Sequence, residues 1–190
     1  GLEPLADRMQ AQADEQGDLE AIATAFVDPE KGVAAAADAL AGARDILAER
    51  ISDDAAVRKM ARELTAAEGV IISTYSDKGD PEKAQEFEMY FDFKEPLRTL
   101  PPHRTLAINR GERLGCLKVT LEAPAEEIVR RIEARYLTNP RSIWTEQVRE
   151  AVADSYKRLI APSIETEVRG ALTEKAEERA ISLFAVNLRN

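Results

Sequence analysis

The 190-residue sequence predicts a mainly α-helical fold, a multi-helix bundle-like assembly with one small antiparallel two-stranded β element. Alanine, leucine, glutamate and arginine dominate the composition, and all four are strong helix formers. Apolar residues recur at every third or fourth position over most of the chain, the spacing of one buried helix face. Two runs alone have strand character, residues 70–75 and 116–121, so we expect them to pair with each other and to lie against helices.

The first predicted part, residues 1–69, is expected to be an N-terminal helical part. Its helices are predicted over residues 3–13, a short stretch from Asp18, 33–51 and 53–67, with a turn at 28–32. Ser52 is expected to cap the last helix, and Gly69 to end it in the left-handed conformation.

The second predicted part, residues 70–123, alternates strand and helix. Val70–Tyr75 is rich in β-branched residues and predicts the first strand. Pro81 is expected to open a helix that runs to about Phe91, and Pro102 to open another over 102–113. Residues 116–121 alternate apolar and polar side chains, which predicts the second strand.

The third predicted part, residues 124–190, is expected to hold three helices. The first runs from Pro124 to about Tyr136, and the second from Ser142 to Ile160. Pro162 is expected to break that second helix and to start the last one, over about 163–188.

Charge is distributed unevenly along the chain, whose formal net charge is −9. Residues 94–118 carry six basic and two acidic side chains, a net of +4, in an otherwise acidic protein. Two interpretations stay open: these cations pair with the carboxylates of residues 1–93, or they contact nucleic-acid phosphates. The candidate contact residues are Arg98, Arg104, Arg110, Arg113 and Lys118.

No catalytic or metal-binding pattern emerges from the sequence. His103 is the single histidine, and no Ser, Cys or carboxylate nearby completes a triad, so a structural role is favoured. Cys116 lies in an alternating apolar run, which favours a buried thiol over a reactive one. One histidine and one cysteine make a metal site improbable, and no phosphate loop or dinucleotide fingerprint is present. We therefore expect a non-enzymatic protein without cofactors.

The single cysteine excludes an internal disulfide, so a reducing, cytoplasmic location is the simplest expectation. No apolar run approaches the roughly 20 residues of a membrane helix, and no signal peptide is evident. The sequence starts at Gly1 without a methionine and ends within a strongly helical run. We expect it to be an excised part of a longer protein.

Short segments along the whole chain, in order, resemble the N-terminal helical region of Tex, the bacterial transcription accessory protein family. These segments are Gly1–Asp7, Val27–Val33, Ala39–Ile46, Ala48–Ile51, Tyr90–Asp92, Glu95–Leu97, His103–Ala107, Arg110–Gly111, Ala176–Glu178, Phe184–Ala185 and Asn187–Leu188. Within them, His103, Arg104 and Gly111 form a structural motif.

The resemblance implies a helical scaffold that precedes an RNase H-like (YqgF-type) domain, helix-hairpin-helix elements and an S1-type OB-fold that binds RNA. Tex-like proteins bind nucleic acid without strong sequence preference, and the helical region is described as containing a helix-turn-helix-like element. The implied partners are RNA or DNA, the other domains of the parent and RNA polymerase, with no membrane. The implied role is to position the RNase H-like and OB-fold domains.

The sequence departs from the family pattern at two places, and the second weakens the expectation of a phosphate contact on its helix. Pro102 stands where the family usually has serine before His-Arg, so a serine cap is lost and a fixed φ is gained. Ala84–Glu88 reads Ala-Gln-Glu-Phe-Glu where the family usually has Gly-Ala-Lys-Phe-Arg, so two positive charges become negative. The competing hypothesis is a protein-interaction module that docks on the transcription or translation machinery through the acidic surface of residues 1–93.

Overall fold

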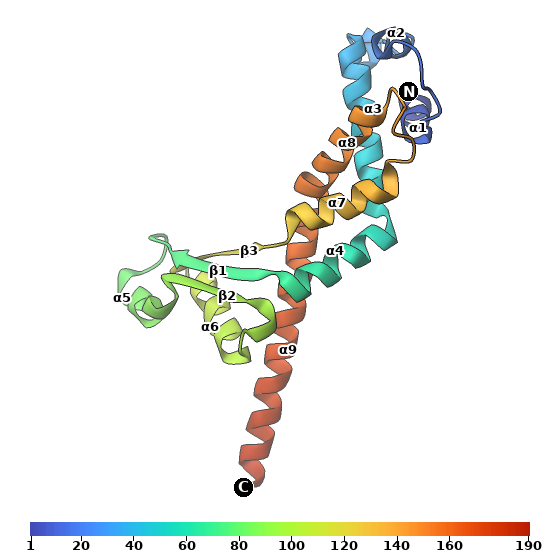
Figure 1. The fold of residues 1–190 in the computed structure, drawn as a ribbon. Helices are drawn as coiled ribbons and strands as arrows, with labels where there is room; N and C mark the ends of the chain where they lie inside the picture. The colour runs from blue at the N-terminus through green and yellow to red at the C-terminus, as the bar shows by residue number, and fades with distance from the viewer. The chain divides into compact units, whose positions relative to one another are not determined.

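The computed structural model describes all residues from 1 to 190 and is mainly helical, as predicted (Figure 1). The chain divides into two compact units, each built from two segments. Unit 1 comprises Gly1–Ala61 and Glu126–Pro162, and unit 2 comprises Arg62–Ala125 and Ser163–Asn190. The three consecutive parts expected from the sequence stay a prediction.

Unit 1 is a helical assembly around α3. Its elements are α1 (Glu3–Ala11), α2 (Leu19–Thr24), the 3-10 turn η1 (Pro29–Lys31), α3 (Ala36–Asp53), the start of α4 (Ala55–Glu68), α7 (Ala125–Tyr136), α8 (Thr145–Asp154) and the π-helical η4 (Ser155–Ile160). Helices α1, α2, α8 and η4 all pack on α3, whose buried stripe includes Ala39, Ala43 and Leu47. The small alanines let α8 approach closely, and Trp144 at its start is fully buried.

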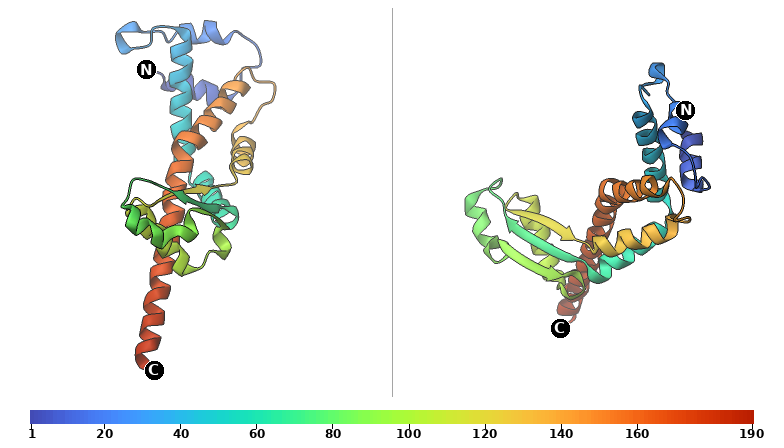
Figure 2. Two further views of the ribbon diagram at one scale, coloured as in Figure 1. Left: turned by 90° about the vertical axis from the view of Figure 1, so that its left-hand side faces the viewer. Right: turned by 45° about the horizontal axis from the view of Figure 1, so that its top comes forward.

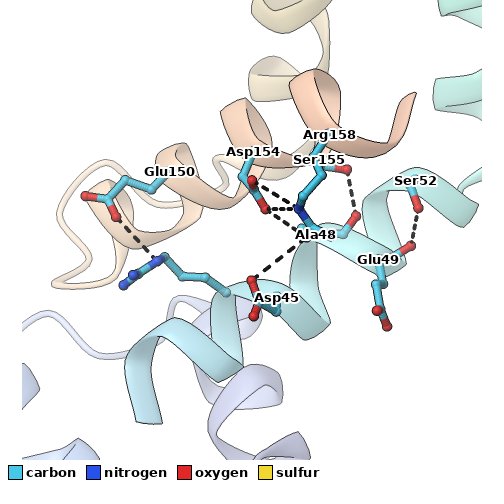
Figure 3. A network of polar contacts seen from close by, with 9 residues as sticks. Asp45, Ala48, Glu49, Ser52, Glu150, Asp154, Ser155 and Arg158 are labelled. Atoms are coloured by element: carbon cyan, nitrogen blue, oxygen red, sulfur yellow. Dashed lines mark hydrogen bonds and ion pairs between the residues drawn. The ribbon is translucent and has the colours of Figure 1, made fainter. Parts of the chain in front are cut away.

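Polar contacts reinforce the packing of η4 on α3 (Figure 3). The buried Ser155 hydroxyl donates to the Ala48 carbonyl over 2.6 Å, so a side-chain donor meets the backbone of the facing helix. At the edge, Arg158 pairs with Asp154 at 2.9 Å and approaches Asp45 to 3.9 Å.

Unit 2 is built on a three-stranded antiparallel sheet in the order β2-β1-β3 (Figures 1 and 2). Its elements are β1 (Val70–Tyr75), α5 (Pro81–Ala84), the 3-10 helix η2 (Gln85–Tyr90), β2 (Asp92–Pro96), the 3-10 turn η3 (Leu97–Thr99), α6 (Pro102–Arg113), β3 (Leu117–Glu122) and α9 (Ala161–Arg189). The predicted pairing of the two strand-like runs is confirmed, because Ile71 faces Leu121 and Tyr75 faces Leu117.

The prediction of only two strands is wrong, because β2 adds a third along β1. Residue Ser73 pairs with Phe93, and Val70 pairs with Pro96. The strand is short, three of its five residues are charged and it ends in proline, so residue propensities do not predict it. Proline is tolerated there because β2 is an edge strand, where no further strand needs its missing N–H.

Other local predictions also need correction. The helix from Pro81 is α-helical only to Ala84 and continues as the 3-10 helix η2. The N-cap of α4 is Asp54, which accepts from the Ala56 N–H over 3.0 Å, whereas Ser52 donates to the Glu49 carbonyl. Gly69 does not adopt positive φ; a Cβ there would collide with the Thr65 carbonyl oxygen.

Helical structure does not stop at Pro162, contrary to the prediction. Residues 155–160 adopt the wider π geometry immediately before it, and α9 starts at Ala161. In a regular α-helix the proline ring would clash with the carbonyl four residues earlier. A π segment is one of the few local changes that accommodates such a residue within a helical run.

Candidate functional site

The basic block of the sequence is organised by helix α6, which covers one face of the sheet. Buried Thr105, Ile108 and Gly111 form its inner side. Gly111 permits the close approach, because a Cβ there would collide with Leu117 and lie 3.0 Å from the Phe87 ring. Gly111 therefore lies where helix α6, strand β3 and the 3-10 helix η2 meet.

Arg104, near the start of α6, is held by residues of β2. Its guanidinium donates to Glu95 Oε1 over 3.1 Å and lies 5.5 Å from the centroid of the Phe93 ring. The second carboxylate oxygen of Glu95 is buried without a hydrogen-bond partner. The arginine therefore compensates a carboxylate that the fold has partly removed from water.

Arg110, six residues later on α6, also has a carboxylate and an aromatic ring beside it, but both members of its ion pair are more than half exposed. It lies 3.3 Å from a Glu86 carboxylate oxygen and 5.7 Å from the centroid of the Phe87 ring. Glu86 is therefore a partner for Arg110 within the chain.

The other three predicted contact residues carry no such partner. Arg98 in η3, Arg113 at the last position of α6 and Lys118 on β3 are exposed and make no side-chain hydrogen bond or ion pair. Arg98 and Lys118 border different hollows of unit 2. The five cations thus divide into two that are held by carboxylates and three that are available to solvent.

His103 and Cys116 lie in opposite environments. The His103 side chain is exposed at the start of α6 and makes no hydrogen bond. Cys116 is fully buried, and its thiol contacts the Leu114 carbonyl at 3.8 Å. No group of three or more His, Cys, Asp or Glu side chains is arranged to hold a metal ion.

Two polar clusters of unit 1 were not anticipated from the sequence. In the first, Asp14 accepts hydrogen bonds from the Arg8 guanidinium at 2.8 Å and from the Trp144 indole N–H at 2.8 Å. The Arg8 hydrogen bond, followed by that of Trp144, lowers the pKa of Asp14 to about 2. The buried indole thereby gains the polar partner that it requires.

In the second cluster, Asp54 receives Arg135 at 2.7 Å and the Tyr136 hydroxyl at 2.7 Å while it caps α4. These hydrogen bonds outweigh desolvation and lower the pKa of Asp54. Burial, followed by the bond to Asp54, raises the pKa of Tyr136 to about 12. The partners are 81 and 82 residues apart, so no local sequence signal marks them.

None of the helices combines the length and the hydropathy that a membrane-spanning segment requires.

The sequence matches the family model described as Tex central region-like over residues 14–184. It is 41% identical over 189 residues to YdcI of Bacillus subtilis (strain 168). The matched region covers 100% of this chain and 26% of YdcI.

Two further relatives have informative names. Transcriptional accessory protein Tex of Neisseria gonorrhoeae is 32% identical over 201 residues, covering 100% of this chain and 25% of the relative. S1 RNA-binding domain-containing protein 1 of Homo sapiens is 31% identical over 203 residues, covering 100% and 20%. The chain spans a quarter or less of the length of these two relatives and about a quarter of YdcI. Because the family model covers most of the sequence, this chain belongs to the Tex central region-like family.

Proposed function

We propose that this chain is a non-catalytic helical scaffold module of a Tex-like, nucleic-acid-binding transcription accessory protein. Its role is to position RNase H-like and OB-fold domains of the longer protein. The names of the relatives support the setting, since one is a transcriptional accessory protein and another an S1 RNA-binding domain-containing protein.

The observation that carries the scaffold role is the apolar end of α9. Ile181, Phe184 and Leu188 recur at helical spacing and are 69%, 65% and 72% exposed. Leu183 and Val186 on the other side are also about half exposed. A helix that is apolar all round is normally buried, so this end fits a surface that other domains cover.

Amide hydrogen exchange tests the scaffold role. In this chain alone, residues 181–188 are expected to exchange rapidly, because no other element protects this helix end. In full-length Tex of N. gonorrhoeae, the matching helix end is expected to exchange at least about tenfold more slowly because docked domains cover it. Equal exchange rates in the two proteins would contradict the scaffold proposal.

A minor contact with nucleic acid is a second candidate function, favoured by the three unpartnered cations. Arg98, Arg113 and Lys118 carry charge that no carboxylate of the chain compensates. Arg104 and Arg110 are tied to Glu95 and Glu86, so phosphate would have to compete with an existing partner. We therefore assign any such contact mainly to the first three residues.

Salt-dependent RNA binding tests this assignment. The chain is expected to bind single-stranded RNA weakly, with an affinity that falls steeply as salt rises. Arg113→Ala combined with Lys118→Ala is expected to reduce the salt slope by about 1 to 2, whereas Arg104→Ala combined with Arg110→Ala changes it less. Undetectable binding, or equal effects of the two pairs, would remove the contact.

A further inference from the structure

Unit 2 contains an apolar groove that the proposed scaffold role does not use. Two hollows of about 320 Å³ and 280 Å³ share Ala66, Leu97, Leu172 and Lys175. Because the lining is shared, the hollows form one continuous depression, here named the α4–α9 groove. Its walls come from the last turns of α4, η3, the start of α6 and the part of α9 that follows Ser163.

The floor of the groove is suited to large apolar side chains from outside. Leu97 and Val168 are only 4% exposed and form a fixed base. Ala66 and Ala171 on the walls are exposed, and their small side chains leave the space unfilled. Small residues on the walls therefore leave space within the groove, whose accessible lining is mainly apolar.

The two hollows differ in the charge at their rims, and only the second has cations without a carboxylate beside them. Arg62 is paired with Glu167 at 2.8 Å, and Glu63 is also engaged within the chain. Arg98 and Lys175 line the second hollow, make no side-chain hydrogen bond or ion pair, and no carboxylate lines it beside them. A partner that fits this groove must present apolar side chains flanked by carboxylates.

On α9 the groove is lined by residues of one helix face. Val168, Ala171, Leu172, Lys175 and Ala176 lie at positions i, i+3, i+4, i+7 and i+8, so they share one side of the helix. At 1.5 Å per residue this side is about 12 Å long, which matches about two turns of a partner helix.

We propose that the α4–α9 groove binds an acidic amphipathic helix of a separate protein. Leucine-like side chains at i, i+3 and i+7 of that helix fill the two hollows, as in other helix-in-groove complexes. Its flanking carboxylates meet Arg98 and Lys175. The groove contains none of the residues 181–188 on which the proposed scaffold role rests.

A labelled 15-residue peptide with leucines at helical spacing, glutamates on both flanks and alanines elsewhere is the probe. The 190-residue chain is expected to bind it saturably in fluorescence anisotropy titrations. Peptides with leucine replaced by alanine, or glutamate by lysine, are expected to bind at least about tenfold more weakly. The first lacks the apolar side chains that fill the hollows, and the second lacks the carboxylates that face Arg98 and Lys175.

Three variants separate the groove from general electrostatics. Arg98→Glu combined with Lys175→Glu is expected to weaken binding about tenfold or more. The matched pair Lys31→Glu and Arg141→Glu changes two exposed, unpartnered cations of unit 1 and is expected to leave binding unchanged. Ala171→Arg adds a cation but fills the groove, so it is expected to weaken binding, whereas simple charge attraction would strengthen it.

Circular dichroism of each variant confirms that its helices are intact. Equal binding of the glutamate and lysine peptides, or stronger binding by Ala171→Arg, would overturn the proposal. Competition by single-stranded RNA would assign the groove to nucleic acid. Self-association in sedimentation that disappears in Arg98→Glu/Lys175→Glu would assign it to a second copy of the chain, and either result overturns a separate protein partner.

Discussion

The two units treat their polar groups differently. In unit 1, Gln12 is only 1% exposed, and its amide joins the Tyr136 carbonyl at 2.6 Å and the Thr138 N–H at 3.1 Å. Asp14 and Asp54 are likewise surrounded by donors from distant segments. In unit 2, the cations Arg98, Arg113, Lys118 and Lys175, the α4–α9 groove and the apolar end of α9 have no partner within the chain.

This difference separates positions that maintain the fold from positions that are available to other molecules. A group whose hydrogen bonds are complete within the chain stabilises the fold and offers little to a ligand. Exposed cations beside apolar hollows contribute little to stability and keep their capacity to bind. Substitutions in unit 1 should therefore affect stability, and those on the open surfaces of unit 2 should affect binding.

The largest expected contrast compares two aromatic truncations. Trp144→Ala in unit 1 is expected to lower the free energy of unfolding by about 4 kcal/mol, because it removes a fully buried side chain and the donor to Asp14. Phe184→Ala in α9 is expected to change it by less than about 0.5 kcal/mol, since the ring is exposed. Urea unfolding followed by circular dichroism measures both, and similar losses would contradict the contrast.

A glycine pair tests whether unit 2 contains a rigid part of its own. Gly111→Ala is expected to lower the free energy of unfolding by about 2 kcal/mol, because the new Cβ collides with Leu117. Gly170→Ala, within α9 and with open space around it, is expected to raise it by up to about 1 kcal/mol. Thermal unfolding of the two variants gives the comparison, and a neutral Gly111→Ala would show that α6 is loosely packed.

These contrasts also show how far the sequence alone could lead. Periodicity located most helices, and β-branched composition located β1 and its pairing with β3. Strand β2 was not predicted, because Asp92, Lys94 and Glu95 give it a polar sequence with low strand propensity. These residues can form a strand there because β2 lies at the edge of the sheet. The helical structure that continues through Pro162 was not predicted either. Proline was expected to end a helix, and the sequence does not reveal the π-helical segment that precedes it.

The sequence identified the candidate functional residues but did not predict which of them would have partners within the chain. Clustered arginines marked α6, but their division into held and exposed cations depends on Glu95 and Glu86, which belong to other elements. The Trp144–Asp14 bond joins residues 130 positions apart, and such pairing has no local sequence signature. Polar contacts between residues that are distant in the sequence could therefore be identified only from the structure.

Acid should affect unit 1 through Asp14. Its pKa of about 2 lies below the ordinary value of 3.8, so its ion pair and hydrogen bonds stabilise the fold above about pH 4. That contribution is lost as the pH falls from about 4 to about 2. Asp14→Asn is expected to lose about 1 kcal/mol at pH 7 and to show a shallower decline of stability over this range. Urea midpoints at several pH values measure it, and a parallel decline would exclude Asp14.

The smallest expected effect compares two arginines of the same helix. Arg104→Ala is expected to lower the free energy of unfolding by about 1 kcal/mol, because Glu95 then keeps a partly buried carboxylate without its cation. Arg113→Ala is expected to change it by less than about 0.3 kcal/mol, since no carboxylate depends on it. Chemical unfolding of the two single variants and of the variant with both substitutions measures the two changes in free energy of unfolding. If Arg113→Ala were the more destabilising change, the exposed cations of α6 would contribute to the fold, and the distinction between paired and exposed cations within unit 2 would fail.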